Sequence, residues 1–262
     1  MSDGGRGVIL ILLSALVFAG ATVFAKLVTT GYGGSVLVVT FCRFALGLAG
    51  TLPGAVAGKI RLRPAKPGLV ALRATTNTAA VFFFFLGIQF TTVTKANLLN
   101  MTYPVFVFLA APIINREQSP RRYFLFLALT LLGTWQVVRP TELSRIAGFA
   151  VGDILAFGSA LLAGVAISYL REARKHDESR TILFYLMLLG TVINGAILPW
   201  VAIPPPKGLL LALAGGALGA VGQLALTVGY RYVPAAVGSL LSASRLIFAV
   251  ALGVVVFGDE LT

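Results

Sequence analysis

The chain has 262 residues, of which 58% are hydrophobic and only 11% are charged, and its formal net charge is +12. A soluble domain has about 25% charged residues and rarely exposes large apolar patches, so this composition argues against a soluble enzyme or a nucleic-acid-binding domain. The basic residues form short clusters between long apolar runs, which is typical of a membrane protein with many spans.

Long apolar runs recur along the whole chain, and a membrane-spanning helix needs about 20 apolar residues. The first run, residues 8–29, exceeds the apolar stretch of about 7–15 residues in a signal peptide, so we interpret it as a span. The sequence predicts nine transmembrane helices with short connections and no separate soluble domain, an all-α integral membrane fold: residues 8–29, 35–57, 68–90, 96–114, 122–138, 148–170, 182–203, 208–230 and 233–257.

The distribution of Lys and Arg between the loops predicts the orientation. With the N-terminus in the cytoplasm, the inside loops hold most of these residues, above all around 59–66 and 171–180, and the outside loops hold few, such as Lys207. We therefore expect a multi-pass protein of the cytoplasmic membrane with a cytoplasmic N-terminus. Arg73, at the start of the third span, is interpreted as marking the cytoplasmic interface.

The two halves of the chain repeat each other. Gly7-Val8-Ile9-Leu10 resembles Gly152-Asp153-Ile154-Leu155, and Leu98-Leu99 recurs as Leu240-Leu241. The predicted units are residues 1–140 and 146–262. Each unit has five helices. Because this number is odd, the second unit enters the membrane from the opposite side, and such inverted repeats are typical of secondary transporters. The second unit stops after its fourth helix, so we expect a tenth helix to be missing, by truncation or because the gene is shorter.

Particular stretches carry a family resemblance: the run from Gln89 to Leu99, Tyr103-Pro104-Val105-Phe106, Arg116-Glu117 with Ser119, Arg43-Phe44, the run from Tyr230 to Leu241, Phe248, and Gly258-Asp259-Glu260-Leu261-Thr262. With them the chain resembles the EamA-type branch of the drug/metabolite transporter superfamily. The resemblance implies ten helices in two inverted five-helix repeats and a transport function. The sequence departs from the family pattern in the absent last helix and in Arg245-Leu246, where the family usually has Glu-Pro.

Charged residues within spans are costly and are functional candidates. All nine acidic residues lie in loops or at span edges, so no buried carboxylate is expected to bind a cation or carry a proton. Arg43 and Arg245, in contrast, lie near the middle of the second and ninth spans. A bound anion would satisfy either guanidinium, and helix packing is the alternative for Arg43.

Polar residues recur every third position on the fourth span and, at the aligned positions, on the ninth. The expected substrate-binding residues are Asn97, Asn100 and Tyr103, their counterparts Ser239, Ser242 and Arg245, and Arg43, Asn77 and Gln223. Facing stripes of this kind would line a central cavity, although Asn and Ser also join helices in membranes. Pro104 lies within the fourth span, where a proline frees a carbonyl that can bend the helix or face a ligand; its counterpart is Leu246, so a proline kink is expected in one half only.

The sequence favours a secondary transporter that moves a small organic metabolite bearing a carboxylate or phosphate, such as an amino acid, by alternating access as an exporter or exchanger. The alternative is a non-transporting membrane scaffold or an intramembrane enzyme. With one Cys and one His, neither a metal site nor a disulfide is expected, and no catalytic residues or cofactor motif are found. The expected partners are the solute and the lipid bilayer, with no nucleic acid; the sequence leaves the oligomeric state open.

Overall fold

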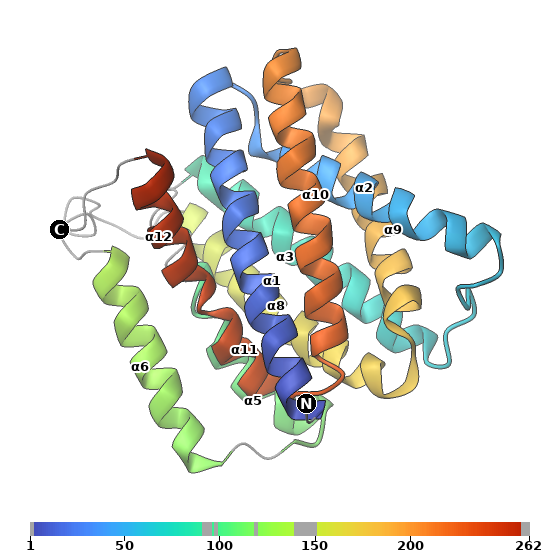
Figure 1. The fold of residues 1–262 in the computed structure, drawn as a ribbon. Helices are drawn as coiled ribbons and strands as arrows, with labels where there is room; N and C mark the ends of the chain where they lie inside the picture. The colour runs from blue at the N-terminus through green and yellow to red at the C-terminus, as the bar shows by residue number, and fades with distance from the viewer. Residues whose placement is uncertain (1–2, 91–95, 97–98, 118–119, 139–150, 258–262) are drawn as a thin grey trace.

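A computed structural model describes residues 3–90, 96, 99–117, 120–138 and 151–257, and the regular structure within these residues is helical throughout, as expected (Figure 1). The helices are α1 (Asp3–Lys26), α2 (Val36–Val56), α3 (Pro67–Phe90), α5 (Tyr103–Ile114), α6 (Arg121–Val138), α8 (Val151–His176), α9 (Ser179–Ile197), α10 (Pro206–Gly229), α11 (Ala235–Ser242) and α12 (Arg245–Phe257). A π-helical turn (Leu27–Gly31) extends α1, and a 3₁₀ turn (Leu198–Trp200) follows α9.

Six segments of the described chain are helical, long and apolar enough to cross a membrane: Asp3–Gly31, Val36–Val56, Val151–His176, Ser179–Trp200, Pro206–Gly229 and Ala235–Val256. Tyr103–Ile114 and Tyr123–Gly133 are shorter apolar helices. The protein is therefore a helical membrane protein with many spans, and the count of nine stays a prediction. Residues 148–150 of the predicted sixth span and the motif at 258–262 lie outside the described residues.

The helix contacts come in matching pairs. α1 packs on α10 and α3 on α8; α2 packs on α10 and α3 on α9; α5 packs on α8, and α1 on α11 and α12. In the predicted repeat, α1, α2, α3 and α5 correspond to α8, α9, α10 and the α11–α12 segment. The two contacts in each pair therefore join corresponding helices. α6 stands at the edge of the bundle, where it contacts α11 (Figure 1).

Glycines of α10 bring it close to α2. A Cβ atom added to Gly216 would lie 2.6 Å from Cys42 Cβ, and one added to Gly219 would lie 2.8 Å from Arg43 Cδ. Gly215 and Gly219 are four residues apart, as are Gly50 and Gly54 on α2, but a Cβ atom added to Gly50 would meet nothing within 4 Å. The small size of Gly216 and Gly219 therefore lets α10 approach α2, and Gly164 on α8 and Gly190 on α9 are packed as closely against Phe106 and Phe44.

Two helices are interrupted at aligned positions. A turn at Met101 and Thr102 precedes α5, and a turn at Ala243 and Ser244 separates α11 from α12. Pro104 stands in the first turn of α5, where its missing N–H costs nothing. The second break needs no proline, because Ser244 Oγ donates to Leu241 O (2.7 Å), an alternative to the regular backbone ladder. Only one of the two breaks is therefore accompanied by a proline, and the other was not predicted.

Candidate functional site

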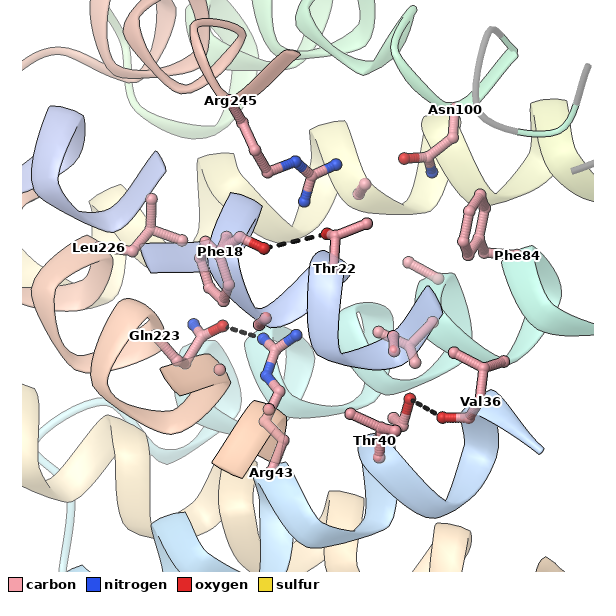
Figure 2. A pocket seen from close by; sticks show the side chains of 18 of the residues that line it. Phe18, Thr22, Val36, Thr40, Arg43, Phe84, Asn100, Gln223, Leu226 and Arg245 are labelled. Atoms are coloured by element: carbon pink, nitrogen blue, oxygen red, sulfur yellow. Dashed lines mark hydrogen bonds between the residues drawn. The ribbon is translucent and has the colours of Figure 1, made fainter. Parts of the chain in front are cut away.

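A cavity of about 710 Å³ lies at the centre of the bundle, between α1, α2, α3, α8, α10 and the two interrupted helices (Figure 2). Its lining runs from Ser14 and Gln223 to Thr29, Thr30 and Val36, where α1 ends and α2 begins. This volume is within the range of about 300–1,000 Å³ found for small-molecule sites. The cavity therefore has room for a metabolite and reaches one end of the bundle.

Most of the residues predicted to bind substrate line this cavity: Arg43, Asn77, Asn100, Tyr103, Gln223, Ser242 and Arg245. Ser239 does not; it is fully buried, its Oγ donates to Ala236 O (2.8 Å), and its carbonyl accepts from Tyr103 Oη (3.1 Å). Ser239 faces the contact between α11 and α5 instead of the cavity, because these two helices pack against each other there. Asn97 lies outside the described residues.

Arg43 joins α2 to α10 inside the cavity. Its Nη2 donates to Gln223 Oε1 (2.5 Å), and its guanidinium stacks over the rings of Phe18 and Phe44, 4.9 and 5.5 Å from their centroids. Gly219 gives the Arg43 stem the space to pass α10. Arg43 thus both packs helices together and presents a positive charge to the cavity.

Arg245 begins α12, and its guanidinium points into the cavity from the side opposite Arg43 (Figure 2). It makes no hydrogen bond or ion pair with any described residue, and it is close enough to Arg43 for their charges to repel. The positive end of the α12 dipole adds to this potential. An anion between the two guanidiniums would relieve the repulsion.

The charged residues that line the cavity are all cations. They are Lys26, Arg43 and Arg245, and no acidic residue occurs among the described residues of the lining. Asp153 does contradict the expectation that no carboxylate is buried, because it is fully buried in the first turn of α8, but it is not part of the cavity wall. The field inside the cavity therefore favours a negatively charged ligand.

The end of the bundle opposite the cavity opening is held by Glu117. Glu117 Oε1 accepts from Arg171 Nε (2.8 Å), and Oε2 accepts from the backbone N–H of Ala235 (2.9 Å). Arg171 Nη1 also donates to the carbonyls of Tyr230 (3.0 Å) and Arg231 (2.7 Å). We call these groups the latch. It joins the turn after α5 to α8 and to the segment between α10 and α11.

Arg73, predicted to mark the cytoplasmic interface, is buried inside the protein and only 1% exposed, and its depth in the membrane stays a prediction. A side chain in the second turn of α3 is covered because α8 and α9 both pack on that helix. The cavity wall also contains Phe18 and Thr22 of α1, which were not among the predicted site residues, and Lys26, which the sequence favours as a side chain reaching the outer interface. Their regular four-residue spacing puts them on one face of a helix and could have revealed them.

Metal and nucleophilic sites are not supported by the described part of the chain. No group of three or more His, Cys, Asp or Glu residues is placed to hold a metal ion there. Cys42 is buried and carries a free thiol. The chemistry available in the cavity is therefore binding by hydrogen-bond donors and positive charge.

Together, the membrane-spanning bundle, its interrupted helices and its central cavity define the architecture of a membrane transporter. The chain belongs to the EamA-like transporter family, whose model matches residues 5–139 and 150–262, so the predicted family is confirmed.

Relatives with known names are transporters rather than enzymes. The chain is 27% identical to the pseudopaline exporter CntI of Pseudomonas aeruginosa over 64% of its own length and 59% of the exporter's, so it spans less than two thirds of that relative. It is 23% identical to human solute carrier family 35 member G1, over 97% of the chain and 73% of the carrier. It is 30% identical to the riboflavin transporter of Rhizobium johnstonii, over 54% of the chain and 46% of that protein.

The fold also matches a solved crystal structure with a TM-score of 0.81. The match covers 98% of this chain and 90% of the other, at 16% sequence identity. At that identity the likeness concerns the fold alone.

Proposed function

We propose that this chain is a secondary transporter that moves a small organic metabolite bearing a carboxylate or phosphate across the cytoplasmic membrane, as an exporter or exchanger. The observation that carries the proposal is the cavity wall, to which Arg43 and Arg245 contribute guanidiniums and in which no acidic residue occurs among the described lining. A guanidinium binds a carboxylate or phosphate through two parallel hydrogen bonds. Amino acids and related metabolites fit this chemistry and the cavity volume of about 710 Å³.

Alternating access between two inverted repeats is the mechanism we infer, with units at residues 1–140 and 146–262. The paired helix contacts and the aligned helix breaks support this arrangement. In such proteins the substrate lies at the interface of the repeats, beside interrupted helices. The cavity adjoins both breaks, with Tyr103 and Arg245 at the first residues of α5 and α12.

Named relatives support a small organic solute. Two of them are named as a pseudopaline exporter and a riboflavin transporter, so each name specifies one transported compound. Neither compound is carried over to this chain. The relatives support the transport class, and the cation-lined cavity supports the charge of the solute.

The experiment is uptake into proteoliposomes that hold purified protein, with a panel of carboxylates, phosphate esters, neutral solutes and organic cations. We expect uptake of members of the anionic or zwitterionic group and little uptake of the cations. Arg63→Gln serves as the control variant, because Arg63 is an exposed loop residue outside the cavity. A preference for organic cations would overturn the anion site, and no flux of any solute would favour the scaffold or enzyme alternative.

A further inference from the structure

Arg73 is a buried cation that the cavity does not explain. It lies on α3 one turn before Asn77, on the same face of the helix, and it is 1% exposed. Asn77 lines the cavity, whereas Arg73 is not part of the wall. α3 begins at Pro67, at the latch end of the bundle. Arg73 is therefore farther from the cavity opening than Asn77 and closer to the latch.

The guanidinium of Arg73 has no hydrogen-bond partner among the described residues. Its Nε, Nη1 and Nη2 are all buried and unpaired, and no carboxylate of the described chain forms an ion pair with it. A buried guanidinium in a membrane-spanning helix is costly, and pairing reduces that cost. A residue with a purely structural role would bond to a neighbouring helix, as Arg43 does to Gln223. Arg73 stabilises no contact of this kind.

The unpaired polar groups around Arg73 are mainly donors. Among the described residues, Asn77 Nδ2 and Tyr230 Oη are also buried without a hydrogen-bond partner. The Tyr230 hydroxyl is within electrostatic range of the Arg73 guanidinium. A ligand with several acceptor oxygens would satisfy these donors, and a guanidinium holds a carboxylate or phosphate in bidentate geometry.

Three guanidiniums follow one another from the cavity toward the latch. Arg245 interacts electrostatically with Arg43, and Arg43 interacts with Arg73. Tyr230, beside Arg73, is also a latch residue, since its carbonyl accepts from Arg171 Nη1 (3.0 Å). Release of the latch would free the segment that carries Tyr230, next to the buried guanidinium.

We propose that Arg73 is a second anion-binding station, which holds the carboxylate or phosphate of the substrate when the latch end of the bundle is open. The inference rests on the proposed function, because it assigns a further residue to the same anionic substrate. In the state described here the anion binds between Arg43 and Arg245, and Arg73 is occluded. In the opposite state the anion moves one step along the series and leaves from Arg73.

Charge rescue at position 73 tests the proposal. In a Cys42→Ala background, which keeps the Cβ atom that packs on Gly216, Arg73→Cys is assayed in proteoliposomes. The probes are labelled L-glutamate, succinate, glycerol 3-phosphate and inorganic phosphate. We expect Arg73→Cys to lower uptake at least tenfold, and aminoethyl methanethiosulfonate, which attaches an ammonium group, to restore at least a third of it. Methyl methanethiosulfonate, which adds no charge, should restore none.

The control is Arg63→Cys in the same background, on an exposed loop, where both reagents should leave uptake unchanged. Equal rescue by the neutral and the charged reagent, or undiminished uptake by Arg73→Cys, would overturn the station. If Arg73→Cys does not reach the membrane, Arg73→Lys replaces it and uptake is measured from each side. A rise in KM of about tenfold from the latch side alone supports the station, and an equal rise on both sides or no rise overturns it.

The wild type separates this inference from the proposed function. If it transports none of the anionic probes but moves other solutes, the anionic substrate is wrong and the station falls with it. If it transports an anion and the Arg73 variants behave as their parent, the station alone is wrong and the cavity site stands.

Discussion

Arg245 is the residue on which the anion site depends most, because it faces the cavity without a partner among the described residues. We predict that Arg245→Ala nearly abolishes uptake of an anionic or zwitterionic solute. Removing one member of a buried charge pair costs about 2–5 kcal/mol, which corresponds to a loss of about 30-fold or more in kcat/KM. Arg245→Lys should weaken transport less, since Lys keeps the charge but loses the bidentate geometry.

Folding should survive this change, because Arg245 forms no hydrogen bond or ion pair between helices among the described residues, whereas Arg43 bonds to Gln223. Thermal unfolding in detergent checks this point, and Arg43→Ala should lower the midpoint where Arg245→Ala does not. Normal transport by Arg245→Ala would contradict the assignment.

The sequence located the cavity residues well where charge or polarity stood out from an apolar span, as at Arg43, Asn77 and Arg245. It could not place Arg73, because its position near a span edge is equally compatible with an interface and with burial beneath α8 and α9. Phe18 and Thr22 were missed for another reason: an aromatic ring or a Thr that donates to its own helix, as Thr22 does to Phe18 O (3.0 Å), is common on any face of a span.

At the scale of helices, the contact between α2 and α10 depends on Gly216. A Cβ atom there would lie 2.6 Å from Cys42 Cβ and 2.7 Å from the backbone nitrogen of Arg43. We predict that Gly216→Ala forces the helices apart and destabilises the protein by about 1–3 kcal/mol, the usual cost of overpacking. Thermal unfolding of the purified protein measures it.

Gly50→Ala is the matched control, because a Cβ atom on Gly50 meets nothing within 4 Å and Ala is the better helix former. Its midpoint should stay the same or rise. A Gly216→Ala variant as stable as Gly50→Ala would mean that the two helices can shift without cost.

Helix ends and breaks divide into those that the sequence specifies and those that only packing reveals. Pro104 identified the first interruption, since a proline cannot continue an internal hydrogen-bond ladder. The interruption at Ala243 and Ser244 carries no such signal, because Ser is common within helices and membrane spans. Its position becomes predictable only when the two halves are aligned, since it matches Met101 and Thr102.

For the whole molecule, the latch is expected to set the balance between its two states. The Glu117 and Arg171 side chains are 18% and 17% exposed, so water screens their ion pair less than it would a surface pair. We predict that Glu117→Gln, which removes the charge but keeps an acceptor for Ala235, destabilises this closed end by about 1–3 kcal/mol. Thermal unfolding should detect the loss.

Glu178→Gln provides the comparison, because Glu178 is exposed and its side chain does not cap α9. It should leave the unfolding midpoint unchanged. If Glu117→Gln and Arg171→Gln have effects that simply add in the double variant, the two residues do not act as one latch.

Sidedness is the last property of the whole molecule that can be tested directly. The loops around 59–66 and 171–180 are rich in Lys and Arg, and such loops stay in the cytoplasm. The cavity lining reaches Thr30, at the opposite end of α1 from Asp3. In a Cys42→Ala background, we predict that Thr30→Cys and Lys207→Cys react with an impermeant maleimide in intact cells, whereas Arg63→Cys and Arg180→Cys react only after permeabilisation. All four positions are exposed, so burial does not limit the reaction. Labelling of Arg63→Cys and Arg180→Cys from outside would reverse the orientation, and the cavity described here would then open to the cytoplasm.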